Sequence, residues 1–243
     1  MIPPDIATLW VYLSTTPLMW LTATLGAYVI ADAVSARLGR NPLANPVLLA
    51  VVLLVMLLQA SGTSFRTYFD GAQFVHFMLG PVTVALAAPL AAQAMRVRRL
   101  LVPMLAALAA GSFTAIAVSV GVAWVLGASL PTTLSLAPKS VTTPIAMAIS
   151  EQIGGIPTLT AVLVILTGIV GAIMVTPLMN ALSLRDYAAR GFAAGVASHG
   201  IGTARAFQVN ELAGTFAGMG LALNGLVTAV LAPALIHLWR ALS

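Results

Sequence analysis

Long apolar runs, separated by short polar stretches, occupy most of this 243-residue chain. The runs are continuous, and several approach the roughly 20 residues that an α-helix needs to cross a bilayer. The strands of a membrane β-barrel would instead alternate apolar and polar positions. Because a helix satisfies its backbone hydrogen bonds within one segment, the pattern predicts an all-α polytopic membrane protein.

We expect about seven to eight hydrophobic segments, because that many apolar runs have lengths near the roughly 20 residues that span a bilayer. The clearer ones cover about residues 7–34, 47–61, 72–95, 100–127, 158–182 and 212–237. Two more stretches, around 138–155 and 197–206, are apolar at their edges but interrupted by proline, glycine and polar residues. The first of these fits a re-entrant loop or a broken helix better than a simple crossing.

The composition supports a membrane location. Hydrophobic residues make up 60% of the chain and charged residues 7%, against roughly 25% charged in a typical soluble domain. The net charge of +5 is explained by the positive-inside rule, so no nucleic-acid partner is expected. The rule predicts cytoplasmic positions for Arg37, Arg40, Arg96, Arg98, Arg99, Arg185, Arg190 and Arg240, and places the connector at 62–71 outside.

The chain is interpreted as a single integral membrane domain, 1–243, with possible repeat halves 1–127 and 128–243. "STTPLM" resembles "VTTPIA", and "SFRTY" from Ser64 resembles "SLRDY" from Ser183. The predicted topology puts the two S-x-R-x-Y connectors on opposite sides, which is typical of the inverted repeats of secondary transporters. Short similarities also arise by chance in apolar sequence, so both explanations stay open.

The stretch "PKSVTTP" concentrates polar and helix-breaking residues between apolar runs. Prolines disturb a helix, and freed backbone groups at membrane depth are tolerated only where protein or water satisfies them. A half-helix that starts here would direct its positive end at an anion. The candidate ligands and breaks are Pro138, Lys139, Ser140, Thr142, Thr143 and Pro144. The alternative is that Lys139 extends to an interface and the Thr-Pro pair is only a kink.

The second interrupted stretch, "ASHGIGTARA", contains Arg205, a candidate for a charge inside the membrane, and glycines that weaken a helix. Its candidate residues are Ser198, His199, Gly200, Gly202, Thr203 and Arg205. The planar fork of Arg205 suits a carboxylate, so we expect the two stretches to bind a small organic anion together. Alternatively, Arg205 is a structural partner of Glu211 or Glu151, and His199 is a hydrogen-bonding group in helix packing.

Other polar residues have weaker roles. Glu151 and His199 are possible coupling groups for proton-driven transport, and Asn224 is positioned to line a path or to join helices. The chain has no cysteine, and His76, His199 and His237 lie far apart, so no metal site and no cofactor are expected. No nucleophile–base set or carboxylate pair has the spacing of a catalytic site, so the protein is not expected to be an enzyme.

Two long segments carry a resemblance to a known family. "LPTTLSLAPKSVTTPIAMAISEQIGGIPTLTAV" and "AARGFAAGVASHGIGTARAFQVNELAGTFAGMGLALNGLVTAVLAPAL" are similar to the signature of the LrgB/CidB family. "NPVLLA" and "TSFRTYFDGAQFVHFMLGPVTVALAAPL" extend the resemblance into the first half. It therefore covers nearly the whole chain and implies a multi-pass protein of the bacterial inner membrane.

The resemblance implies two functions. One is a holin- or antiholin-like protein that modulates murein hydrolase activity and autolysis with an LrgA/CidA-type membrane partner. The other, from a similar domain in the plastid glycolate/glycerate translocator, is a secondary transporter of small monocarboxylates such as glycolate, glycerate and pyruvate. The interrupted segments favour transport, because anion sites of transporters lie between broken helices. A homodimer is expected by analogy with other transporters.

Overall fold

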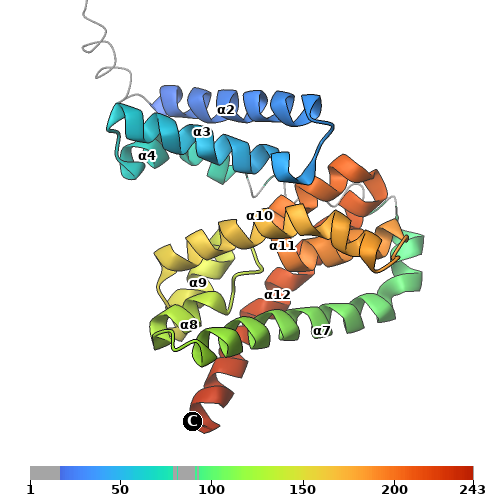
Figure 1. The fold of residues 1–243 in the computed structure, drawn as a ribbon. Helices are drawn as coiled ribbons and strands as arrows, with labels where there is room; N and C mark the ends of the chain where they lie inside the picture. Colours follow the sequence, from blue (N-terminus) through green and yellow to red (C-terminus); the bar gives the residue numbers. More distant parts are fainter. Residues whose placement is uncertain (1–16, 79–80, 82–90, 92, 243) are drawn as a thin grey trace, which may run out of the picture. The chain divides into compact units, whose positions relative to one another are not determined.

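The computed structural model describes residues 17–78, 81, 91 and 93–242, and every long regular element in them is a helix (Figure 1). The prediction of an all-α protein is therefore confirmed for the described residues. The helices are α2 (Pro17–Arg37), the 3₁₀ turn η1 (Pro42–Ala44), α3 (Pro46–Ser61), α4 (Phe65–Phe77), α7 (Ala94–Val125), α8 (Leu130–Leu136), α9 (Thr143–Ile153), α10 (Pro157–Ala181), α11 (Tyr187–Val209) and α12 (Glu211–Leu242). They belong to two compact units, Met1–Ala85 and Leu86–Ser243.

Within the described residues, four helices are long and apolar enough to cross a membrane, namely α2, α7, α10 and α12. The shorter apolar α3 coincides with the predicted segment at 47–61. The expected segments at 100–127, 158–182 and 212–237 match α7, α10 and α12 to within a few residues. Much of the expected segment at 72–95, and the start of the one at 7–34, lie outside the described residues. The total of seven to eight segments therefore stays a prediction.

The first unit packs α2 against both α3 and α4. Trp20 is 1% exposed, and its ring meets Tyr68 edge-on at 5.8 Å. The stretch predicted to be a connector is partly helical. The reason is local: Gly62, at φ 64°, ends α3, and the Ser64 hydroxyl then accepts the amide of Thr67 at 3.1 Å to start α4.

In the second unit, α7 and α12 run in the same direction. Met104 and Leu108 of α7 pack in a cluster with Phe216 of α12. Ser112 then hydrogen-bonds Asn224 at 2.7 Å, and further along both helices Ile116 joins a cluster that contains Ile236. We name the two ends of this unit the Arg96 end and the Arg240 end, after the arginines near the start of α7 and the end of α12.

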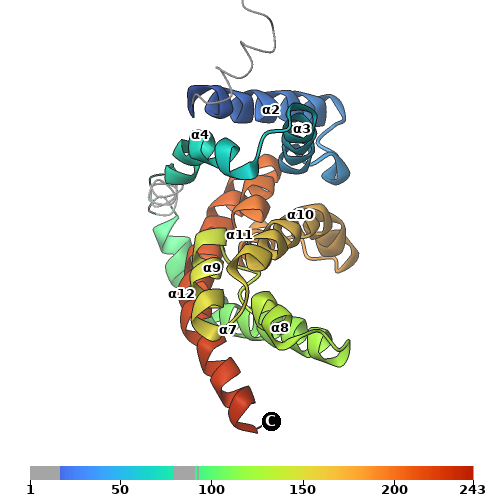
Figure 2. The same ribbon diagram turned by 90° about the vertical axis from the view of Figure 1, so that its left-hand side faces the viewer.

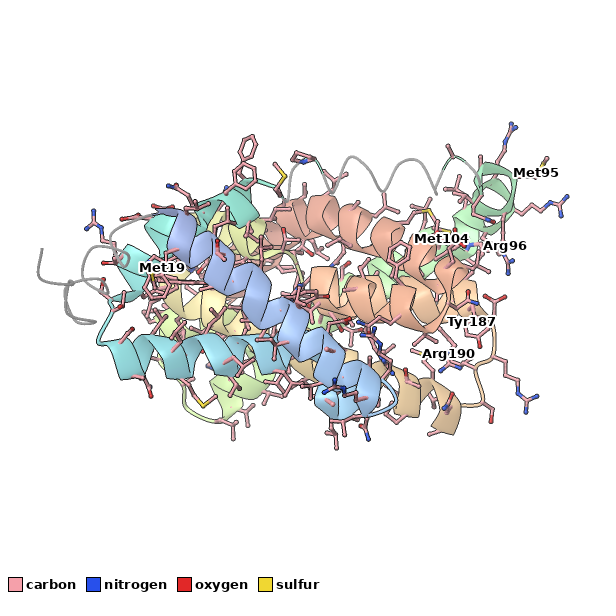
Figure 3. The ribbon with its side chains drawn as sticks, turned by 90° about the horizontal axis from the view of Figure 1, so that it is seen from above. Met19, Met95, Arg96, Met104, Tyr187 and Arg190 are labelled. Atoms are coloured by element: carbon pink, nitrogen blue, oxygen red, sulfur yellow. The ribbon has the colours of Figure 1, made fainter. Side chains whose placement is uncertain are left out.

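Helix α10 runs the opposite way and brings α11 to the Arg96 end. Asn180, near the end of α10, accepts a hydrogen bond from Arg190 at 2.9 Å. Arg96 forms an ion pair with Asp186, the residue that caps α11, at 3.2 Å. Figure 3 shows Arg96, Tyr187 and Arg190 together at this end.

Helix α11 is a hairpin of two helical arms. Ser198 and His199 have non-helical backbone angles, and they separate a first arm at 187–197 from a second arm at 200–209. A Cβ atom on Gly202 would lie 2.7 Å from the Ala194 carbonyl oxygen, although a straight helix would separate these residues by about 12 Å. The second arm therefore returns alongside the first, and α12 starts at the Arg96 end.

This reversal corrects one part of the predicted topology. The sequence predicts that Arg240 lies on the same side of the membrane as Arg96, whereas the structure places the two arginines at opposite ends of the second unit. Since α11 turns back, α12 starts where α11 started and ends at the opposite end of the unit. There the Arg240 guanidinium donates to the Ile153 carbonyl at 2.7 Å and closes the end of α9.

Candidate functional site

The stretch around Lys139 forms a loop between two short helices at the Arg240 end. Ser135 of α8 accepts the amide of Ile156 at 2.8 Å, so α8 lies beside the start of α10. The chain then moves toward the middle of the unit, where the Ser140 carbonyl accepts the Asn224 side-chain amide at 3.2 Å. Helix α9 leads back to the Arg240 end, where Ile153 meets Arg240. The segment thus enters and leaves at the same end, as expected for a broken, re-entrant element.

The break in α11 falls at Ser198 and His199 instead of at the glycines that follow. His199 has φ 42° and ψ −136°, a region that non-glycine residues enter at a cost of about 1–3 kcal/mol. Its ring is buried, and its Nε2 lies 2.9 Å from the Val164 carbonyl oxygen. Gly168 makes room for the ring, because a Cβ there would lie 2.6 Å from the His199 Cε1 atom. His199 therefore fixes the tip of the hairpin against α10.

Asn224, in the middle of α12, joins the two interrupted segments. Its side-chain nitrogen donates to the Ser140 carbonyl at 3.2 Å and to the Val196 carbonyl at 2.9 Å. Its side-chain oxygen accepts the hydroxyls of Ser112 at 2.7 Å and Thr228 at 3.2 Å. The side chain is 1% exposed, so these hydrogen bonds form in the buried interior. Asn224 thus ties the tips of two opposed hairpins to α7 and α12.

The two cationic candidates line different cavities. Lys139 is half-buried in a hollow of about 480 Å³ between α7 and α8, beside Ser119 and Leu136. Arg205 is buried on the second arm of α11 and lines a cavity of about 20 Å³ with Arg190. The structure therefore joins the two interrupted segments through Asn224, at Ser140 and Val196, and it places Lys139 and Arg205 in different cavities.

The remaining predicted residues are distributed along these segments. Thr142 is the N-terminal cap residue of α9, and its carbonyl accepts the amide of Ala146. The Thr203 hydroxyl donates to the His199 carbonyl at 2.9 Å. The buried residues among them are Pro138, Ser140, Ser198, Gly202 and Thr203. Thr142 and Thr143 are half-buried, and Pro144, Glu151 and Gly200 are exposed.

Two features of the site were missed by sequence reasoning. In the sequence analysis Arg190 serves only to predict the membrane orientation, although it lines the same cavity as Arg205. Arg240 is treated likewise, although it closes the end of α9. Arg190 could have been identified only from the hairpin in α11, which brings its two arms side by side. Predicting the hairpin requires knowing that the helix breaks at Ser198 and His199, and residue spacing in the sequence does not give the position of the break.

Comparison with known proteins identifies relatives along nearly the whole chain. A family model described as the LrgB-like family matches residues 24–238. The holin-like protein CidB of Staphylococcus epidermidis is 28% identical over 228 residues, which cover 94% of this chain and 98% of that protein. The antiholin-like protein LrgB of Bacillus mycoides is 29% identical over 218 residues, covering 90% and 95%. The uncharacterized protein YwbG of Bacillus subtilis is 35% identical over 218 residues, covering 89% and 96%. No solved structure matches the chain.

Proposed function

The chain belongs to the LrgB-like family, and from this premise we propose that it is a holin-like or antiholin-like membrane protein. The observation that carries the proposal is the match to relatives with these names over almost their full length. In this role the protein modulates murein hydrolase activity and autolysis, together with an LrgA/CidA-type membrane partner. Such a role requires no catalytic residues in the chain.

The proposed setting is the bacterial inner membrane, crossed several times. The arginine-rich Arg96 end of the second unit faces the cytoplasm by the positive-inside rule. The Arg240 end then faces outward, and the loop around Lys139 enters the membrane from outside. The hairpin of α11 enters from the cytoplasm.

An internal repeat remains part of the proposal. It is supported by the connectors after α3 and α10, which both contain a residue with positive φ, Gly62 at 64° and Ser183 at 58°. Gly62 is followed by the S-x-R-x-Y motif that starts at Ser64, and Ser183 is itself the first residue of the second motif. Both motifs lead into a helix.

A second candidate function is secondary transport of small monocarboxylates such as glycolate, glycerate or pyruvate. One observation favours it, namely the meeting of two opposed broken segments at Asn224. Interrupted helices that meet near the membrane midplane are how many secondary transporters build a substrate site. The helix breaks and the internal charges have no evident use in a purely structural membrane partner.

In this second candidate, the anion is held by residues of both segments. The proposed ligands are Lys139, Ser140, Thr142, Thr143, Ser198, His199, Thr203 and Arg205, and Glu151 and His199 are the proposed coupling groups. Because Lys139 and Arg205 line different cavities, they would act at different stages of a transport cycle. A homodimer would give the moving part a fixed scaffold.

Two assays separate these functions. The first compares murein hydrolase activity and detergent-induced lysis in a strain that lacks the gene and in the same strain carrying it. The second measures uptake of labelled glycolate and pyruvate, and leakage of an inert dye, in proteoliposomes of the purified protein. Altered lysis with no saturable uptake supports the holin-like or antiholin-like role alone. Saturable uptake without dye leakage supports transport, and unchanged lysis contradicts the first proposal.

A further inference from the structure

A groove runs along the later part of α7, where α8 lies beside that helix (Figure 2). The two helices meet where the Ser119 hydroxyl lies 3.2 Å from the Leu136 carbonyl oxygen. The groove has a volume of about 480 Å³ and follows α7 from Thr114 to Leu126, which corresponds to about 18 Å of helix. The groove is therefore elongated along the helix axis.

Small and apolar side chains line most of the groove. Ala115, Ser119 and Ala123 lie about one helical turn apart and are half-buried or buried, so they form its floor. Beside them Val118 and Val122 are 56% and 53% exposed, so the groove is open along its side. Small residues at this spacing let the backbone of a second helix approach closely in a membrane.

Lys139 is the charged residue of this lining and the one lysine of the chain. It is half-buried. Within the part of the chain that the structure describes, Lys139 forms no ion pair and no acidic side chain lines the groove. A charge in an apolar membrane environment is costly unless an opposite charge accompanies it. The groove is therefore complementary to an occupant that brings a carboxylate.

Lys139 lies at the depth of the middle of the long helices. The carbonyl of the next residue, Ser140, accepts the side-chain amide of Asn224, and the Asn224 oxygen accepts the Ser112 hydroxyl. Ser112 and Asn224 lie near the middle of α7 and α12, which are both long enough to cross a membrane. Lipid phosphates lie at the edges of a hydrocarbon core roughly 30 Å thick, too far away to pair with Lys139.

The shape of the groove separates the two remaining sources of a carboxylate. A small free acid would compensate the charge of Lys139 but would leave most of the apolar length of the groove without a contact. A transmembrane helix with one acidic side chain provides both, because its side fills an elongated groove and its carboxylate reaches the lysine.

We propose that the groove between α7 and α8 is the docking site of a transmembrane helix of a partner protein, which carries an aspartate or glutamate at mid-membrane depth opposite Lys139. The helix packs along Ala115, Ser119 and Ala123, and its carboxylate pairs with Lys139. The inference rests on the first proposed function, in which the protein acts with a membrane partner. It gives Lys139 a different role from that in the second candidate function, where Lys139 is a ligand of the transported acid.

The test is resonance energy transfer between the full-length protein and a synthetic transmembrane peptide in phosphatidylcholine vesicles. The peptide has about 20 leucine and alanine residues with one central glutamate, and a matched peptide has a central glutamine. Because the chain has no cysteine, Leu130→Cys gives a single site for the donor dye. Leu130 begins α8, is 49% exposed and does not line the groove.

Two variants alter the groove, and each has a matched control. Lys139→Gln removes the charge, and Arg98→Gln removes the charge of an exposed arginine elsewhere on α7. Ser119→Leu fills the floor of the groove, and Ala117→Leu adds a similar volume at an exposed position of α7 that does not line it. Lys139→Glu, tested with a peptide that has a central lysine, reverses both charges and is used if Lys139→Gln is not monodisperse.

The wild type should bind the glutamate peptide about tenfold more tightly than the glutamine peptide, as for a hydrogen bond between charged groups. Lys139→Gln should remove this preference, and Ser119→Leu should weaken binding of both peptides. The two control variants should behave like the wild type. In Lys139→Glu the preference should pass to the lysine peptide.

Equal binding of the glutamate and glutamine peptides by the wild type would overturn the docking site, and so would a preference that survives Lys139→Gln. Displacement of the glutamate peptide by sodium glycolate at equal concentration would assign Lys139 to a small acid and reject the helix. The lysis comparison tests the first proposed function separately. Altered lysis without a peptide preference keeps that function and rejects the groove, whereas a Lys139-dependent preference with unchanged lysis keeps the groove and rejects the function.

Discussion

The side-chain amide of Asn224 donates a hydrogen bond of 2.9 Å to the Val196 carbonyl, just before the α11 helix breaks at Ser198. The Val196 carbonyl belongs to the last turn of the first arm, next to the break, where helical hydrogen bonding ends. The same amide reaches Ser140, on a segment that arrives from the opposite end of the unit. One side chain therefore supplies a hydrogen-bond donor beside both breaks, which stabilises irregular backbone in an apolar interior.

Replacing Asn224 with Leu should destabilise the second unit by roughly 1–3 kcal/mol, because two carbonyls lose their shared donor. Ser112→Ala, which removes one donor to Asn224, should have a smaller effect. Unfolding in mixed micelles measures both changes. Equal stability of Asn224→Leu and the wild type would show that water or movement satisfies the two carbonyls.

A pair of glycines in the second arm of α11 provides a matched comparison. A Cβ on Gly202 would lie 2.7 Å from the Ala194 carbonyl oxygen, whereas one on Gly200 meets nothing within 4 Å. We expect Gly202→Ala to push the arms apart and cost roughly 1–3 kcal/mol. Gly200→Ala should be neutral or stabilise by up to about 1 kcal/mol, because alanine favours a helix.

Unfolding measurements on the two alanine variants test the hairpin directly. The reverse order of stabilities would indicate that α11 continues as a straight crossing helix, since the close approach at Gly202 exists only when the arms fold together.

The contact between Arg240 and Ile153 should control the end of α9. The Ile153 carbonyl belongs to the last turn of that helix and accepts the Arg240 guanidinium at 2.7 Å. Arg240→Gln should therefore increase hydrogen exchange around residues 150–155, by about tenfold if the contact contributes about 1.4 kcal/mol. Arg98→Gln, at the other end of the unit, should leave that region unchanged. Unaltered exchange in Arg240→Gln would mean that Gly154 alone ends the helix.

The long helices were predictable because their signal is local. Unbroken apolar runs of spanning length give α7, α10 and α12 directly, and Pro157 marks the start of α10. Polar and breaking residues likewise indicated both interrupted segments. In these cases the residues that determine an element all lie within the length of one helix, so the element can be predicted from the local sequence.

The rest depended on contacts between distant residues. Gly200 and Gly202 indicate a break near 200, but the break falls at Ser198 and His199, and Gly168 of α10 provides the space for the His199 ring. Arg240 was assigned to the wrong end because a crossing and a hairpin have the same composition. Arg190 and Arg205 share a cavity only after that hairpin forms, and no spacing rule brings them together.

The absence of cysteine from the chain makes the topology directly testable by single-cysteine labelling. Arg98→Cys and Arg185→Cys report the Arg96 end, and His237→Cys reports the Arg240 end, all three at exposed positions. If α7 and α12 cross the membrane in the same direction, a membrane-impermeant maleimide added to intact spheroplasts labels only the cysteine at 237. Inverted vesicles should give the opposite pattern, because the arginine-rich end faces the cytoplasm. Labelling of all three cysteines from one side would mean that α11 crosses the membrane, and it would remove the basis for two opposed hairpins that meet at Asn224.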